Sequence, residues 1–204
     1  MSSSSVSGKN WVFRNFDFSD VTKFSENYSL TEIVAKLLSI RKKNIGDINI
    51  FLNPKIKNLL PNPLKLKDMK KAIDRTYKGI ISKETLGIFG DYDVDGASST
   101  AILKRYFSSL NLKVVTYIPD RQSEGYGPSS AGFQSLIDNN VKIIYTVDCG
   151  TMSYKPIKLA RDLNVDTIVL DHHQSDIKLP KAHAIVNPNR YDDDSELNYL
   201  CASG

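Results

Sequence analysis

Residues 86–96 read Leu86-Gly87-Ile88-Phe89-Gly90-Asp91-Tyr92-Asp93-Val94-Asp95-Gly96, an apolar run followed by alternating aspartates and a glycine. The apolar run predicts a buried strand, and the glycine predicts a turn before a helix. In extended geometry the three aspartates share one face, where they would repel one another unless cations neutralised them. A single Asp-x-Asp pair would more simply cap a helix. Three carboxylates after a buried strand instead favour a site for Mg²⁺ or Mn²⁺, which prefer oxygen ligands.

Short apolar runs alternate with helical patterns through the rest of the chain. The runs are rich in β-branched residues and too short for helices, so they predict strands at 86–89, 114–118, 143–147, 167–170 and 184–186. The patterns between them predict helices at 97–109, 129–139 and 153–163. The alternation predicts an α/β fold with a parallel, Rossmann-like sheet that carries helices on both faces. Residues that follow parallel strands gather at one carboxyl edge, so their side chains should form one cluster.

Further candidate site residues follow the later strands. Asp148 comes after one strand, and Asp171-His172-His173 comes after the next. An imidazole ligand shifts the metal preference toward Mn²⁺ without excluding Mg²⁺. Adjacent side chains diverge, so we expect His172 to bind metal and His173 to face the substrate, contacting phosphate or passing a proton.

A loop with phosphate-binding character follows the second predicted strand. It begins with Asp120-Arg121 and continues through Glu124-Gly125-Tyr126-Gly127. Arginine can donate two parallel hydrogen bonds to a phosphate, and glycines let backbone amides approach an anion. Taken alone, the Gly-Tyr-Gly sequence is simply a turn. Together with the acidic cluster, the loop indicates two bound cations, a phosphoester and an activated water.

The N-terminal part of the chain is basic. Residues 1–85 carry 16 Lys and Arg against 8 Asp and Glu, whereas residues 86–204 carry 11 against 15. We expect a disordered terminus at 1–10, a mainly helical segment at 11–84 and the α/β domain at 85–204. One helix is expected from Ser29, which would form a capping box with Glu32, to the basic residues Arg41, Lys42 and Lys43. A second carries Leu66, Met69, Ile73 and Ile80 on its apolar side, with exposed lysines off that stripe.

Several features set the class of protein. The composition, 41% apolar and 25% charged, is that of a globular protein, and no run reaches the length of a membrane span. The serine-rich start lacks the apolar core of a secretion signal, so we expect a cytoplasmic protein. Cys149 and Cys201 have no ligand-like spacing and are expected to be reduced. A basic face next to an acidic cluster is typical of a protein that holds a polyanion beside cations.

The motifs at 90–96, 146–150 and 171–174 together resemble the first three motifs of the DHH phosphoesterase superfamily, in particular its RecJ-type single-stranded-DNA exonucleases. The resemblance extends over most of residues 30–204. It implies stepwise 5′-to-3′ hydrolysis of single-stranded DNA in repair and recombination, with a two-ion site for Mn²⁺ or Mg²⁺. Single-stranded DNA is the implied partner, and a single-strand-binding protein and a helicase are candidate protein partners. No membrane partner is expected.

The resemblance also assigns roles to residues of this chain. It implies metal ligation by Asp93, Asp95, Asp148 and His172, with Asp91 as an accessory acid and His173 as a phosphate or catalytic contact. The expected substrate-binding and phosphate-binding residues are Arg121, Glu124, Gly125, Tyr126, Gly127, Asn187 and Arg190.

Two departures from the family pattern accompany the match. Some relatives have a histidine where this chain has Phe89, and the chain ends at Gly204, before the family's fourth motif. We therefore expect a truncated form with weak metal affinity and little turnover. Two alternatives stay open. One is a phosphodiesterase for small nucleotides or oligonucleotides, and the other is an inactive remnant or a module that binds nucleic acid or a partner through residues 30–85.

Overall fold

The computed structural model describes residues 5–10, 12, 14–41 and 45–204 of the chain. These residues form two compact units, 1–60 and 61–204. The larger unit contains the α/β sheet and every candidate site residue.

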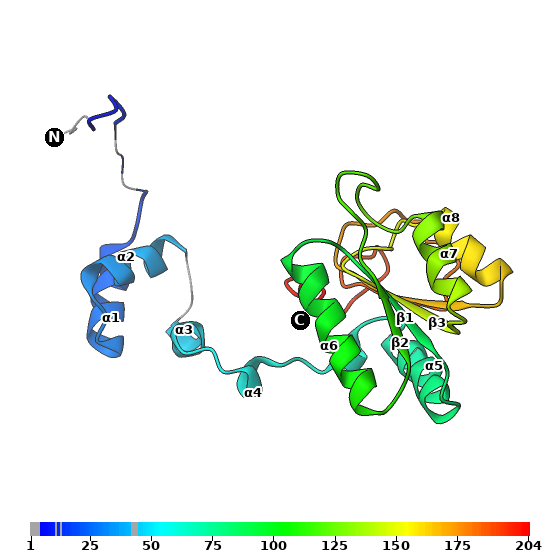
Figure 1. The fold of residues 1–204 in the computed structure, drawn as a ribbon. Coiled ribbons are helices and arrows are strands. Elements are labelled where there is room, and N and C mark those ends of the chain that lie inside the picture. The colour runs from blue at the N-terminus through cyan, green and yellow to red at the C-terminus, as the bar shows by residue number, and fades with distance from the viewer. Residues whose placement is uncertain (1–4, 11, 13, 42–44) are drawn as a thin grey trace. The chain divides into compact units, whose positions relative to one another are not determined.

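The larger unit is built on a five-stranded parallel sheet in the order β2-β1-β3-β4-β5 (Figure 1). The predicted parallel α/β fold is confirmed, with strand ends within one residue of those expected. The strands are β1 (Leu86–Gly90), β2 (Val114–Tyr117), β3 (Ile143–Val147), β4 (Asp166–Leu170) and β5 (Ala184–Val186).

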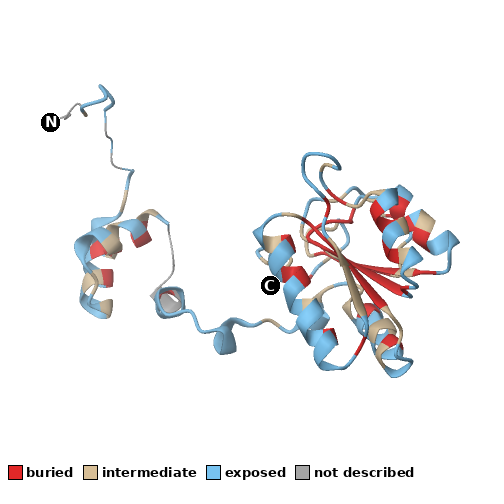
Figure 2. Ribbon diagram, viewed as in Figure 1, coloured by how far each residue is buried: buried red, intermediate tan, exposed pale blue. Residues whose placement is uncertain are grey.

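Helices cover both faces of the sheet, as the sequence predicts. The helices of this unit are η1 (Pro63–Lys65), α5 (Met69–Ile81), α6 (Val94–Ser109), α7 (Ser130–Asp138) and α8 (Tyr154–Asp162). On one face, Phe133 of α7 and Ile157 of α8 pack in a core with Phe89 of β1. On the other, Ala72 of α5 and Phe107 of α6 pack with Tyr145 of β3. Figure 2 shows most of the sheet as a buried layer between these helices, whereas β2 is only partly buried.

The predicted helix around residues 66–80 is confirmed as α5, but it belongs with the sheet. It packs against β5, and its N-terminal cap Asp68 accepts a hydrogen bond from the Ile185 N–H at 3.1 Å. The boundary between the two units accordingly lies between residues 60 and 61, whereas the sequence predicted a domain boundary between residues 84 and 85. Long-range packing of α5 on the edge strand cannot be read from the local pattern.

The smaller unit is helical. Its helices are α1 (Phe18–Tyr28), α2 (Glu32–Ile40), α3 (Ile45–Leu52) and α4 (Ile56–Leu59). Their core contains the buried residues Val21, Phe24, Ala35, Leu38 and Ile48. Ahead of them, residues 5–9 form a turn in which the Gly8 N–H donates to the Ser5 carbonyl at 2.8 Å.

The expected capping box at Ser29 is wrong. Ser29 adopts a left-handed conformation with φ 51° and ends α1, a helix that the sequence analysis did not predict. The residue that caps α2 is Thr31, which makes no side-chain capping bond. Arg41 is the C-terminal cap of α2, and Lys42 and Lys43 lie outside the described residues.

The structure also gives the length of the helices relative to a membrane span and the surroundings of the two cysteines. Within the described part of the chain, no helix is both long and apolar enough to cross a membrane. Cys149 is buried and Cys201 is exposed, with no disulfide at either among the described residues, and their expected reduced state stays a prediction.

Candidate metal centre

The carboxyl edge of the three central strands carries three aspartates. Gly90 pairs with Val147, and Val147 pairs with Leu170. The next residue of each strand is therefore Asp91, Asp148 or Asp171, and the three lie side by side at one edge. All three are at least 95% buried, with exposed fractions of 3%, 1% and 5%. The predicted convergence of these loops is thus present.

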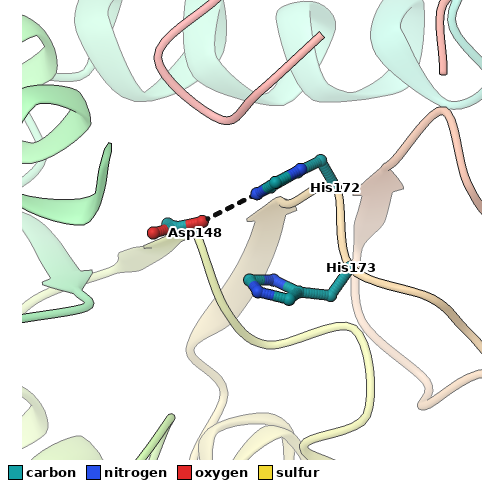
Figure 3. A group of neighbouring side chains, drawn as sticks. All are labelled: Asp148, His172 and His173. Atoms are coloured by element: carbon teal, nitrogen blue, oxygen red, sulfur yellow. Dashed lines mark hydrogen bonds and ion pairs between the residues drawn. The ribbon is translucent and has the colours of Figure 1, made fainter. Parts of the chain in front are cut away.

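Two overlapping groups of side chains could each hold a metal ion. One is Asp91, Asp93 and Asp148, and the other is Asp148, His172 and His173; in each group the ligand atoms lie within 4.8 Å of one another. Asp148 belongs to both groups. Figure 3 shows it on the loop after β3, facing the two imidazoles on the loop after β4. A shared carboxylate between two ligand groups is an arrangement that suits a pair of ions.

Asp148 is the centre of the cluster. Its backbone is left-handed, with φ 62°, and one carboxylate oxygen, Oδ1, lies 3.2 Å from the Nε2 atom of His172. The other oxygen, Oδ2, is buried and has no hydrogen-bond partner among the described residues. Burial, together with the neighbouring carboxylates of Asp93 and Asp95, raises the pKa of Asp148 to about 7. Because burial and neighbouring negative charges destabilise the ionised form of Asp148, a cation that replaces its proton would stabilise the carboxylate.

Asp91 and Asp93 approach Asp148 from the first loop. Burial raises the pKa of Asp91, and its Oδ1 atom is a second buried oxygen without a partner in the described part of the chain. Asp93 is exposed and caps α6, where it accepts a hydrogen bond from the Gly96 N–H at 2.9 Å. That bond lowers the pKa of Asp93, so this carboxylate is ionised at neutral pH. The capping and metal-binding interpretations of the motif are therefore compatible.

Asp95 stands at the border of the cluster. Its Oδ1 accepts from the Ser203 N–H and its Oδ2 from the Ala202 N–H, both at 2.8 Å. Although burial opposes ionisation, these donors lower the pKa of Asp95. Its Oδ2 lies 3.6 Å from the Nε2 atom of His172. Asp95 is thus near the predicted ligands, but the two ligand groups described above do not include it.

A buried network fixes His173. One oxygen of Asp171 lies 2.8 Å from the Nδ1 atom of His173, and the other accepts from the N–H and the hydroxyl of Thr151 at 3.0 and 2.6 Å. Although burial opposes ionisation, these donors lower the pKa of Asp171. Burial likewise opposes protonation of His173, yet the hydrogen bond and charge of Asp171 raise its pKa. An ionised acceptor implies that Nδ1 of His173 carries the hydrogen, so the ring nitrogen that can act at the site is Nε2, which lies 3.3 Å from the Tyr126 hydroxyl.

Asp171 and Thr151 have a role at the site that was not predicted from the sequence. The signal for Asp171 was present, because a carboxylate next to a functional histidine commonly orients it. Thr151 carried no such signal, since it is 20 residues from its partner in the sequence.

The glycine-containing loop after β2 reaches the cluster through Tyr126. Its hydroxyl lies 3.1 Å from Nδ1 of His173 and donates to the Asp148 carbonyl at 3.3 Å. Gly125 and Gly127 flank it with φ 80° and 81°, a left-handed conformation that favours glycine. Arg121 lies over the Tyr92 ring, 5.2 Å from the ring centre, and its charge partly offsets the effect of burial, which raises the pKa of Asp91. Tyr126 and Arg121 thus lie at the cluster, and their role in phosphate binding stays a prediction.

Three other predicted phosphate contacts instead bond within the protein. Glu124 accepts from the Tyr117 hydroxyl at 2.6 Å and from the Asp120 N–H at 2.9 Å. Asn187 is fully buried and donates to the Thr151 hydroxyl at 2.8 Å and to the His173 carbonyl at 2.9 Å. Arg190 donates to the Asp68 carboxylate at 3.0 Å and to the Ile185 carbonyl at 2.6 Å. Their geometry is that of residues supporting the loops, and a direct substrate contact stays a prediction.

A cavity of about 320 Å³ opens beside His173. Its lining comes from the loops after β2, β3 and β4 and includes Tyr126, Gly150, Thr151 and Asp171. The volume is at the lower end of the range for small-molecule sites. The cavity could therefore receive a single nucleotide or another small phosphoester.

The residues present fit a divalent metal. The two buried oxygens without partners among the described residues, Asp91 Oδ1 and Asp148 Oδ2, are unfavourable unless a cation or water meets them. Carboxylate oxygens with one or two imidazole nitrogens suit Mn²⁺ or Mg²⁺. The fold and the site together define an α/β protein with a metal-ligand cluster at the carboxyl edge of a parallel sheet.

Comparison with known proteins assigns the family. Residues 85–204 match the family described as "DHH family, N-terminal domain". The chain belongs to the DHH family. The expected resemblance is confirmed over the whole sheet from β1 onward.

Individual relatives are exonucleases by name. The chain is 35% identical over 88% of its length to the single-stranded-DNA-specific exonuclease RecJ of Bacillus subtilis (strain 168), covering 23% of that protein. It is 34% identical over 69% of its length to the RecJ of Escherichia coli (strain K12), covering 24%. The chain thus spans about a quarter of the length of these relatives.

Solved structures agree with the fold. A crystal structure of exonuclease RecJ bound to manganese matches with a TM-score of 0.63 and 28% identity, covering 71% of this chain and 36% of that one. The RecJ of Thermus thermophilus, also in complex with Mn²⁺, matches with a TM-score of 0.67 at 21% identity, covering 87% of this chain and 24% of that one. The second likeness supports the fold alone.

Proposed function

We propose that this chain carries the catalytic DHH portion of a RecJ-like 5′-to-3′ single-stranded-DNA exonuclease that acts in DNA repair and recombination. The observation that carries the proposal is the convergence of Asp91, Asp93, Asp148, His172 and His173 at one edge of the sheet. The names of the relatives supply the substrate. A bound Mn²⁺ or Mg²⁺ pair would lower the pKa of a water and stabilise charge on the phosphoryl oxygens.

The roles of the residues follow from their surroundings. Asp93, Asp148 and His172 would hold the ions, with Asp95 as a further ligand on the His172 side. Asp91 is an accessory acid whose buried oxygen faces the same space. His173, with its raised pKa and its Nδ1 hydrogen engaged by Asp171, would contact a phosphate oxygen or donate a proton through Nε2.

Two surrounding residues would position the substrate. Arg121 is an exposed cation close enough to Asp91 to affect its ionisation, so it can meet a phosphate at the rim. Tyr126 holds His173 and offers a ring for a base. Cytoplasmic location and the predicted partners, a single-strand-binding protein and a helicase, belong to the same proposal.

The experiment is hydrolysis of a 5′-labelled single strand with Mn²⁺ and with Mg²⁺. Release of labelled mononucleotides that depends on metal and is lost in Asp148→Ala supports the proposal. Metal-dependent release from the 3′ end, or none from DNA, contradicts it. The weak metal affinity and low turnover expected from the sequence are measured in the same assay, against a full-length relative.

A second candidate is favoured by the cavity beside His173. About 320 Å³ suits a small phosphoester better than a polymer. Faster hydrolysis of a dinucleotide or a cyclic dinucleotide than of a 30-nucleotide strand would favour this hypothesis. The third hypothesis, a binding module without activity, predicts binding through residues 30–85 that survives Asp93→Ala and Asp95→Ala in EDTA.

A further inference from the structure

A basic groove lies along α5, and its lining includes none of the candidate metal ligands. Its volume is about 690 Å³, and the part of the chain from Leu64 to Lys78 forms most of its wall. The groove follows α5, which Figure 1 shows beside the sheet. Its positively charged lining consists of Lys65, Lys67, Lys70, Lys71, Arg75 and Lys78, and its acidic lining of Asp68, Asp74 and Asp194.

Half of these cations are held by carboxylates. Lys67 pairs with Asp192, Lys70 with Asp74, and Arg75 with both Glu84 and Asp166. The positive charges of Lys67, Lys70 and Arg75 are therefore largely neutralised within the protein.

The other three cations are free to meet a ligand. Lys65, Lys71 and Lys78 are exposed and form no ion pair with any described residue. Lys71 and Lys78 are seven residues apart on α5, which places them on one face of the helix. The helical rise separates them by about 10 Å, a distance that phosphates a few nucleotides apart can match. Lys71 and Lys78 therefore place two unpaired positive charges in a row along the groove.

Hydrogen bonds connect the groove to the metal centre. Asp68, in the groove wall, accepts from Arg190 at 3.0 Å. The neighbouring residue, Asn189, donates through its side-chain amide to the His172 carbonyl. One end of the groove is thus fixed to the loop that carries a predicted metal ligand. A strand whose end lies at the site could continue along this wall.

We propose that the α5 groove binds the phosphate backbone of the single strand beyond the nucleotide at the metal centre. The inference rests on the proposed function for its substrate and adds a second contact region to it. Lysines that contact phosphates without reading bases give affinity independent of sequence. Such a region would raise the affinity for long strands over short ones.

The test measures binding of a fluorescent (dT)30 strand to the whole 204-residue chain in EDTA, where hydrolysis does not occur. The groove variant is Lys71→Glu with Lys78→Glu. The matched control is Lys104→Glu with Lys142→Glu, which makes the same charge change at exposed lysines outside the groove. Circular dichroism and thermal melts verify that both variants fold.

The groove variant should bind (dT)30 at least ~10-fold more weakly than the wild type at low salt, while the control changes less than ~2-fold. Loss of two phosphate contacts should also lower the slope of log K against log salt by roughly 1.4, at about 0.7 per contact. Binding of (dT)4 should be equal in both variants. Equal loss of (dT)30 binding in both variants, no loss in the groove variant, or no binding by the wild type overturns the inference.

Two further outcomes separate this inference from the proposed function. A chain that binds (dT)30 through the groove but hydrolyses no DNA contradicts the exonuclease proposal and leaves the groove assignment standing. A chain that hydrolyses DNA with an unchanged KM for (dT)30 in the groove variant supports the activity and overturns the groove. Tighter binding of a ten-residue glutamate peptide than of (dT)30 would assign the groove to an acidic protein partner and also overturns it.

Discussion

The Nδ1 atom of His173 lies 2.8 Å from the carboxylate of Asp171, two residues before it, and that carboxylate is buried. The same carboxylate accepts the backbone N–H groups of His172 and His173 at 2.8 and 3.2 Å. One buried aspartate therefore sets the backbone and the ring of the residue predicted to meet the substrate. Its charge also raises the pKa of that ring, although burial opposes the shift.

Asp171→Asn should lower turnover roughly 10- to 100-fold, as loss of an orienting carboxylate commonly does. An amide can donate where the carboxylate accepted, which favours the wrong tautomer of His173. The pKa of His173, followed by NMR in metal-free protein, should fall. Asp176→Asn, exposed on the same loop, serves as the control and should change neither quantity. An unchanged His173 pKa in Asp171→Asn would refute the orienting role.

Asp148 predicts an unusual dependence of stability on pH. Its pKa is raised to about 7 by burial and by its acidic neighbours, whereas an unfolded aspartate titrates near ~3.9. Between these values the folded state binds more protons, so this group's contribution to the free energy of unfolding falls as pH rises from about 4 to 7. The slope is at most about 1.4 kcal/mol per pH unit.

Urea unfolding of metal-free protein at several pH values measures this slope. Asp148→Asn should remove the decline between pH 4 and 7. Saturating Mn²⁺ should reverse it in the wild type, because metal binds the deprotonated carboxylate. Identical slopes in the wild type and in Asp148→Asn would show that Asp148 titrates normally.

The close contact between Gly96 and the backbone of Asp91 leaves no room for a side chain at position 96. A Cβ added there would lie 2.5–2.7 Å from backbone atoms of Asp91, which cannot move like a flexible side chain. Gly96→Ala should therefore cost about 1–3 kcal/mol of unfolding free energy and weaken Mn²⁺ binding, since it displaces the Asp91 backbone. Ser98→Ala, exposed in the same helix, should stay within about 0.5 kcal/mol. Full stability and metal affinity in Gly96→Ala would contradict the close contact.

The hydroxyl and the ring of Tyr126 should have separable roles: the hydroxyl supports His173, and the ring binds a base of the substrate. Its hydroxyl contacts His173 and the Asp148 carbonyl, whereas its side chain is more than half exposed, at 56%. Tyr126→Phe keeps the ring and should lower turnover more than it raises KM, while Tyr126→Ala should also raise KM through lost stacking, worth about 1–3 kcal/mol per base. Steady-state kinetics on (dT)30 measure both. Equal effects of the two variants on KM would exclude stacking.

Local patterns were enough to predict the sheet and the residues at its edge. The strands from Leu86 to Val186 are short apolar runs in a regular alternation, and parallel topology then brings Asp91, Asp148 and His172 together. The same local reasoning failed at Ser29, where a capping-box spacing coincides with the end of α1. The first helix carries Phe18, Val21, Phe24 and Tyr28 at helical spacing, and its N-terminal cap Asp17 accepts from the Ser19 N–H, so its signal was present in the sequence.

The roles of polar residues were harder to predict because their partners are distant in the sequence. The sequence indicates that Arg190 is available to bind phosphate, but in the structure it donates to Asp68, which lies 122 residues away in the sequence. Asn187 is buried beside the loop that carries His173, and it donates to the hydroxyl of Thr151, which lies 36 residues away in the sequence. Tyr126 was predicted at the site, but its contact with His173 spans 47 residues. Such pairings depend on tertiary packing and are not encoded in local spacing.

The most direct measurement is anomalous scattering at the manganese edge from crystals of this chain grown with Mn²⁺. We predict two manganese peaks that share Asp148 as a ligand, one on the side of Asp93 and the other on the side of His172. Crystals that diffract well and show manganese only elsewhere, or none at the carboxyl edge, would contradict it.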